Sequence, residues 1–95
     1  MIFPTLHLNG TSGPMLIEGY KDAVRAVNAA IDAMAKIEFN GRDYYPQGDD
    51  AFRQARKEHA ARFEALNQVQ AELIKIAMSV HDQQAERDEM RRAHS

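Results

Sequence analysis

Large apolar side chains recur along the first half of the chain at alternating spacings of three and four. They are Ile17, Tyr20, Val24, Val27, Ile31 and Met34. This heptad spacing predicts an amphipathic helix with a coiled-coil type of seam, and the alanines beside the seam would let a second helix approach closely. Pro14 suits a first helical turn, and Ser12 or Gly13 suits the cap position before it. We therefore expect a helix over residues 14–38.

A second apolar seam occupies most of the remaining chain. Its members, three or four positions apart, are Phe52, Ala55, His59, Phe63, Leu66, Val69, Leu73, Ile76 and Val80. Asp49 and Asp50 stand before this seam, where acidic side chains can cap the free N–H groups and complement the helix dipole. The pattern predicts a second helix over residues 49–81. No glycine or proline follows, so the polar tail, residues 82–95, either continues the helix or frays.

Residues 39–48 interrupt the helical period and form the expected connection. The pair Asn40-Gly41 is typical of a chain that leaves a helix through a left-handed residue. Pro46 and Gly48 should keep the next residues out of a helix.

Residues 1–13 form a short arm, in which Pro4 argues against a regular helix. Its apolar side chains are Ile2, Phe3, Leu6 and Leu8. We expect the arm to pack along a neighbouring helix, and the alternative is a strand that pairs across subunits.

Together these elements predict an all-α fold, an antiparallel two-helix hairpin with an N-terminal arm, in a single domain spanning residues 1–95. Two helices bury one stripe each against the other, and the edges of a wide stripe stay open. A hairpin of this size is rarely stable alone without disulfides or a metal, and the chain has no cysteine. We therefore expect the hairpins to assemble into a helical-bundle homo-oligomer.

Composition and charge narrow the classes of partner. The net charge is −2, and the basic residues are scattered along the chain. The sequence therefore shows no concentrated basic patch that would bind DNA or an anionic membrane surface. No segment approaches the roughly 20 apolar residues that a membrane span requires. The first residues lack the basic start and apolar run of a signal peptide, which favours the cytoplasm.

No catalytic or metal-binding constellation stands out. The four histidines form no His-x-x-x-His pair, and no Gly-x-Ser-x-Gly elbow or glycine-rich nucleotide motif is present. His59 falls on the apolar seam, where a hydrogen-bonded core histidine is the expected role and a metal ligand is the alternative. We expect a protein that is not an enzyme and that uses no cofactor.

The connection holds the first group of candidate ligand-binding residues, which are Arg42, Tyr44, Tyr45 and Gln47. Aromatic faces can stack a base, an amide can bond its edge, and a guanidinium can hold a phosphate. The alternative is structural, with both tyrosines plugging the end of the hairpin and Arg42 bonding a carbonyl.

The second group lies where the first helix begins and comprises Asn9, Thr11 and Ser12, followed by Lys21 and Arg25 within the helix. Small polar residues before a helix leave N–H groups that can face an anion, and the two cations could supply charge near that end. Ordinary capping and solvation are the alternative explanation.

The run from Asn40 to Gly48, with Asn9-Gly10-Thr11-Ser12 ahead of the first helix, resembles a class of small phage and prophage proteins. In size and hairpin build the chain is also similar to the phage anti-CBASS sponges, small helical oligomers that sequester cyclic dinucleotide and trinucleotide signals of bacterial defence. This resemblance implies an anti-defence protein that binds a cyclic nucleotide at subunit interfaces, without catalysis, in the cytoplasm of a host bacterium. The alternatives are a protein that binds and blocks a host defence protein, or a structural or assembly accessory with no ligand.

Overall fold

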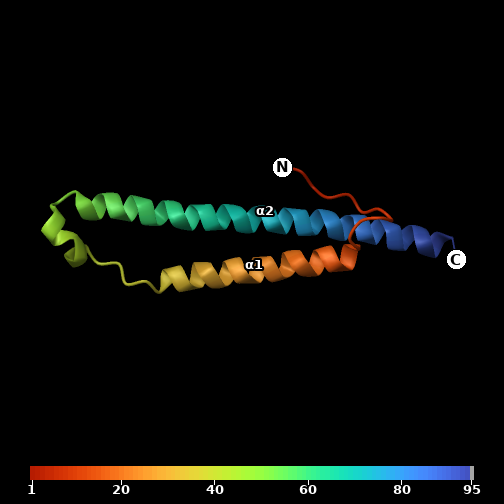
Figure 1. The fold of residues 1–95 in the computed structure, drawn as a ribbon, viewed down its shortest axis with the longest axis horizontal. Coiled ribbons are helices and arrows are strands. Elements are labelled where there is room, and N and C mark those ends of the chain that lie inside the picture. Colours follow the sequence, from red (N-terminus) through yellow and green to blue (C-terminus); the bar gives the residue numbers. More distant parts are fainter. Residues whose placement is uncertain (95) are drawn as a thin grey trace.

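A computed structural model describes residues 1–94, which form a long helical hairpin preceded by an extended arm (Figure 1). Helix α1 spans Gly13–Ala35, the short 3₁₀ helix η1 spans Gly41–Gln47, and helix α2 spans Ala51–Ala93. The two α-helices lie side by side and run in opposite directions, and η1 closes one end of the pair. These residues contain no strand, so the all-α prediction is confirmed.

Both seams face the space between the helices, but they are only half-buried. Every predicted seam residue of α1 is of intermediate exposure, and so are those of α2 except Val69, which is exposed, and Val80, which is buried. Val80 is the one fully buried large apolar side chain among residues 1–94. The hairpin is long and thin, measuring 72 × 22 × 20 Å, so one chain encloses almost no interior.

Helix α1 begins as expected and ends three residues early. Ser12 is its N-cap, and the Ser12 hydroxyl accepts a hydrogen bond from the Met15 amide at 3.3 Å. At the other end, the amides of Lys36 and Ile37 bond carbonyls three residues back, a tight pattern that closes a helix. The prediction that the helix reaches Glu38 is wrong, because Phe39 turns inward to stack on His59 of α2.

The connection is more regular than expected. Residues 41–47 form a 3₁₀ helix that was not expected, and this helix ends at Gln47, one residue after Pro46. Residues 48–50, which follow, lie outside both helices, in line with the expectation for Pro46 and Gly48. Asn40 is extended, with φ −121° and ψ 141°, and the left-handed residue is Gly48, with φ 103°. The absence of a side chain at Gly48 permits this backbone conformation.

Helix α2 begins later and ends later than its seam indicated. Asp50 occupies the cap position, but its carboxylate accepts from the Arg53 guanidinium at 2.9 Å and makes no cap bond, so the predicted acidic cap is wrong. The helix continues to Ala93, so the tail is helical through that residue; Ser95 lies outside the described residues. No residue after Gly48 interrupts the helical hydrogen bonds, which is why α2 extends past the apolar seam.

The arm packs along α2, as expected. Gln83 fixes it at two points: its side-chain oxygen accepts from the Leu6 amide, and its side-chain nitrogen donates to the Pro4 carbonyl, both at 2.9 Å. Ile2 and Leu8 remain more than nine-tenths exposed. The arm is therefore held on α2 through its backbone, and Ile2 and Leu8 stay open.

None of the helices in residues 1–94 combines the length and the apolar character needed to cross a membrane.

Candidate functional site

At the closed end of the hairpin, aromatic rings from both sides of the connection pack together. Phe39 stacks on His59 with ring centroids 4.6 Å apart, and it lies 5.4 Å from Phe52. Tyr44 joins them from η1, 5.7 Å from Phe39 and 5.8 Å from Phe52. Phe63 meets the edge of the His59 ring at 5.1 Å. His59 is thus a core residue, as expected, and the structure holds it by ring contacts where a hydrogen bond was expected.

The first group of candidate residues divides into two kinds. Tyr44 is half-buried in the aromatic cluster and has the structural role of a plug. Tyr45 is 76% exposed, and Arg42 and Gln47 are exposed as well. Arg42 makes no hydrogen bond or ion pair within residues 1–94, contrary to the structural alternative, in which it would bond a carbonyl. A small hollow of about 250 Å³ lies beside Tyr44 and Tyr45.

At the open end, the second group lies around the start of α1. A turn closed by the Gly10 amide and the His7 carbonyl at 3.2 Å leads into it, and Asn9 and Thr11 are exposed there. The Ser12 hydroxyl is engaged in capping α1. The capping explanation therefore accounts for Ser12, whereas Asn9 and Thr11 keep their side chains available.

Lys21 and Arg25 are not at this turn. Both line an open groove between the helices, and Arg25 forms exposed ion pairs with Asp22 and Glu18 of its own helix. The expectation that they supply charge near the start of α1 is not supported by their positions, because they lie about two and three turns further along the helix.

Two other cations occupy the place where the sequence predicted Lys21 and Arg25. A hollow of about 330 Å³ beside the start of α1 is lined by His7, Leu8, Gly10, Ser12, Gly13, Pro14, Gln84, Arg87 and Arg91. Arg91 lies 3.9 Å from the Asp88 carboxylate, and Arg87 makes no ion pair within residues 1–94. Sequence reasoning missed both arginines because the pattern does not distinguish a helical tail from a frayed one. Their spacing of four residues, on one face of a helix that passes α1, is the signal that could have found them.

The close approach of the two helices at this end depends on Gly13. It is buried, and a Cβ built on it would collide with the side-chain oxygen of Gln84. Gln84 is itself held by a bond from its side-chain nitrogen to Asp88 at 2.9 Å. This arrangement fixes the two arginines of α2 beside the start of α1.

The two groups of candidate residues lie at opposite ends of the molecule (Figure 1). Because the hairpin is 72 Å long, one chain does not bring the connection and the arm turn together. Any site that uses both groups requires residues from more than one copy.

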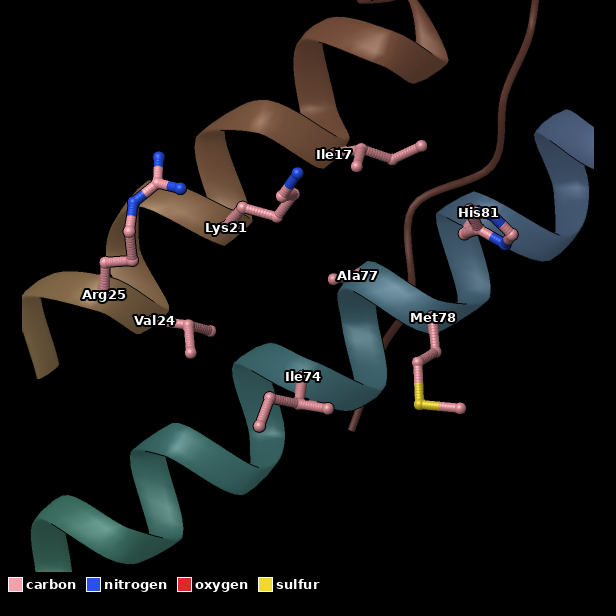
Figure 2. A pocket seen from close by; sticks show the side chains of 8 residues that line it. All are labelled: Ile17, Lys21, Val24, Arg25, Ile74, Ala77, Met78 and His81. Atoms are coloured by element: carbon pink, nitrogen blue, oxygen red, sulfur yellow. The ribbon is translucent and has the colours of Figure 1, made fainter. Parts of the chain in front are cut away.

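An open groove between the helices, about 430 Å³ in volume, is lined mostly by apolar side chains. Figure 2 shows it from close by, with Ile17 and Val24 contributed by α1 and Ile74, Ala77 and Met78 by α2. Met78 is 60% exposed and Ile74 39%. Lys21, Arg25 and His81 complete the rim.

A second groove, of about 610 Å³, lies nearer the connection and has a basic character. Arg53, Arg56 and Lys57 line it together with Phe39, His59, Ala60 and Phe63, and no carboxylate is part of the lining. Arg53 pairs with Asp50, and the guanidinium of Arg56 lies 5.8 Å from the centre of the Phe52 ring. Lys57 has no charged partner within residues 1–94.

Residues 1–94 contain no group of three or more histidine, aspartate or glutamate side chains that could hold a metal ion. Comparisons with protein families, with characterised proteins and with solved structures give no match to this chain.

Proposed function

We propose that this chain is a binding protein that acts as an assembly of hairpins and carries out no catalysis. The observation that carries the proposal is the surface that a single hairpin leaves open. The chain, of mass 10.7 kDa, exposes 7358 Å². A compact monomer of the same mass would expose about 5500 Å².

The excess surface is large enough to matter energetically. It amounts to roughly 1900 Å², and a standard interface buries about 800 Å² on each partner, so two such faces fit on one hairpin. The shape supports the same conclusion, because the radius of gyration is 20.6 Å. A compact chain of this length has a radius of gyration of about 12 Å. A helical-bundle oligomer would bury the exposed side chains that the fold leaves open.

Sedimentation equilibrium of the full chain, from low micromolar to sub-millimolar concentrations, tests this proposal. The expected mass is a multiple of 10.7 kDa, with helical content that rises or stays constant as the oligomer forms. A folded, helical species that keeps the mass of one chain throughout this range would overturn the proposal.

A more specific form of the proposal is that the assembly sequesters a cyclic nucleotide signal. The observation that favours it is the hollow in which Arg87 and Arg91 stand beside the arm turn, since two guanidinium groups on adjacent turns can hold a phosphate. The exposed Tyr45 offers a ring face for stacking at the other end of the hairpin. The resemblance to phage anti-CBASS proteins provides the ligand class, the phage origin and the host cytoplasm as the place of action.

Calorimetry against cyclic dinucleotides and trinucleotides at moderate salt tests this form. We expect at least one ring to bind more tightly than about 10 μM and to be recovered chemically intact after heating. The double variant R87Q/R91Q should bind at least tenfold more weakly. R62Q/K75Q, which removes two charges elsewhere on α2, is the matched control and should bind as the wild type does.

If no ring binds below that limit, the sequestration proposal fails and the assembly proposal stands. The exposed apolar groove of Figure 2 then favours the alternative in which the helical surface binds and blocks a host defence protein.

A further inference from the structure

One face of α2 is exposed over most of its length, interrupted by the half-buried Phe63. We name it the open flank: it runs from Arg56 to Glu89 through Ala60, Ala71, Ile74, Met78 and Ala85. Successive members of this row are separated by whole turns or multiples of three and four residues, so they share one side of the helix. Every one of them is exposed in the single chain. Both large grooves open onto this flank, the apolar one at Ile74 and Met78 and the basic one at Arg56 and Ala60.

The two halves of α2 carry opposite charge. Residues 51–70 contain four basic and two acidic side chains, a net charge of +2, whereas residues 71–90 contain two basic and five acidic ones, a net charge of −3. The basic half also lies at the positive end of the helix dipole, where cations are unfavourable. A second α2 running in the opposite direction would set the basic half of each helix against the acidic half of the other.

The open flank is self-complementary in one particular register. When two copies of α2 cross antiparallel about the midpoint between Glu72 and Leu73, Arg56 lies opposite Glu89 at both ends of the contact. Within it, Ala60 meets Ala85 and Glu64 meets His81.

At the centre of this register, Ala71 of each copy lies against Ile74 of the other. The small alanine side chains allow the two helices to approach to about 8 Å, the short end of the usual range for packed helices. The exposed Ile74 and Met78 would then lose their contact with water, which favours association.

We propose that the occupant of the open flank is a second copy of this chain, docked antiparallel in this register. The proposal rests on the proposed function, because it requires that hairpins associate. The basic groove is incomplete in one chain, and the partner's Glu89 supplies the carboxylate that its lining lacks. The overlap of residues 56–89 is about 50 Å long and one helix wide, roughly 500 Å² on each copy before α1 adds its share.

Pairing on this flank leaves the arm in place. Gln83 holds the arm through both of its side-chain polar atoms. It is rotated by about 140° around α2 from Met78, at roughly 100° per residue. The hollow that contains Arg87 and Arg91 lies on the arm side as well, so it stays accessible in the pair.

Spin labels at single introduced cysteines test whether the two copies of α2 pair antiparallel. The described residues contain no native cysteine that would also be labelled. Gln68 and Glu86 are both exposed. Their separation in the sequence corresponds to a whole number of helical turns, so labels on them point the same way. In the antiparallel pair the distance between equivalent labels is about 20 Å for Q68C and about 40 Å for E86C. Two similar short distances would mean a parallel pair and would overturn the proposal.

A charge exchange tests the register. R56E places two carboxylates opposite each other at both ends of the contact, and E89R places two guanidinium groups there, so each variant alone should dissociate about tenfold more readily than the wild type. Mixing the two variants should restore wild-type affinity, because both contacts then pair opposite charges. The matched control is a mixture of R62E with E89R, whose mixed pair still sets two guanidinium groups against each other at one end and should therefore bind more weakly than the R56E/E89R pair.

The outcomes separate the two proposals. A folded protein with the mass of one chain and no distance between labels overturns both the assembly and this register. An oligomer with equal label distances, or without recovery on mixing, overturns the register and leaves the assembly standing.

Discussion

Along the C-terminal half of α2, one side is covered by the chain's own arm and the other is bare. On the covered side, Gln83 binds the backbone of Pro4 and Leu6, and its side-chain nitrogen lies 3.4 Å from the Ser79 hydroxyl. On the open flank, Ile74 and Met78 are exposed beside a groove. One side of α2 is thus covered by the arm of the same chain, and the open flank has no neighbour within the chain.

The difference lies in the chemistry that each side presents. The covered side offers an amide side chain that can satisfy an extended backbone, which has free N–H and C=O groups of its own. The open flank offers apolar and small side chains, which gain free energy against another apolar surface and little against a polar backbone. A helix with matching small and apolar residues, such as a second α2, suits that flank.

The largest effect is expected where the two helices of one chain meet. Leu73 is a half-buried seam residue, and L73D places an unpaired charge between α1 and α2. We expect a loss of at least about 3 kcal/mol, enough to unfold a hairpin whose stability depends on both faces. Circular dichroism should report lost helix, and A61D, on the exposed side of α2, should keep its helical signal. A folded L73D variant would contradict the packing of the seam.

The next effect sharpens the contrast between the two sides. M78D places a charge on the open flank without touching the seam, so the hairpin should keep its helical content and lose affinity for its copies. We expect the dissociation constant to rise at least tenfold in sedimentation experiments, about 1.4 kcal/mol. Q68D, at an exposed position that faces away from α1, is the control and should associate normally. An M78D variant that associates as the wild type does would leave the open flank without a role.

On the covered side the expected effect is smaller. Q83A removes two part-buried hydrogen bonds to the arm. The free energy of unfolding should fall by about 2 kcal/mol, roughly 1 kcal/mol for each bond. Hydrogen exchange at the Leu6 amide should accelerate, and the oligomeric mass should not change. Q54A, which loses one exposed bond to Glu58, should leave exchange at Leu6 as it was. Unchanged protection of Leu6 in Q83A would mean that the arm is not held by Gln83.

The smallest effects concern the connection. The Tyr44 ring packs on Phe39 and Phe52, whereas the Tyr45 side chain is exposed. Y44A should therefore lose about 1.5 kcal/mol of stability, and Y45A should change stability by less than about 0.5 kcal/mol. Thermal melts check both values. If a folded R42A/Y45A variant keeps its function in cells, the exposed part of the connection is removed as a ligand site.

The heptad seams predicted from the sequence account for most of the fold. Apolar spacing placed both helices, Ser12 placed the start of α1, and the arm was expected along a helix. The helices and the cap depend on residues near each other in the chain, whereas the arm is held by Gln83, far along the sequence, which the pattern did not identify. The end of α1 also depends on a distant residue, since Phe39 stacks on His59, which follows far along the chain in the other helix.

Less of the candidate site could be predicted from the sequence, because its residues are distant in the chain and meet only in the folded structure. Lys21 and Arg25 were chosen because they are near the arm turn in sequence, yet a helix carries them away from it. Arg87 and Arg91 come from the opposite end of the chain, and only the antiparallel packing of a fully helical α2 brings them there. The tail contains one large apolar residue, Met90, so periodicity gave no sign of its conformation.

Small-angle X-ray scattering of the full chain over a range of concentrations measures whether hairpins associate, the proposition on which the binding surfaces depend. The forward intensity gives the mass, and the same curve gives the radius of gyration. We predict a mass of at least two chains of 10.7 kDa at tens of micromolar and above, falling toward one chain on dilution. A concentration-independent mass of one chain, with a radius of gyration near 20.6 Å, would show that the hairpin is stable alone and would contradict association.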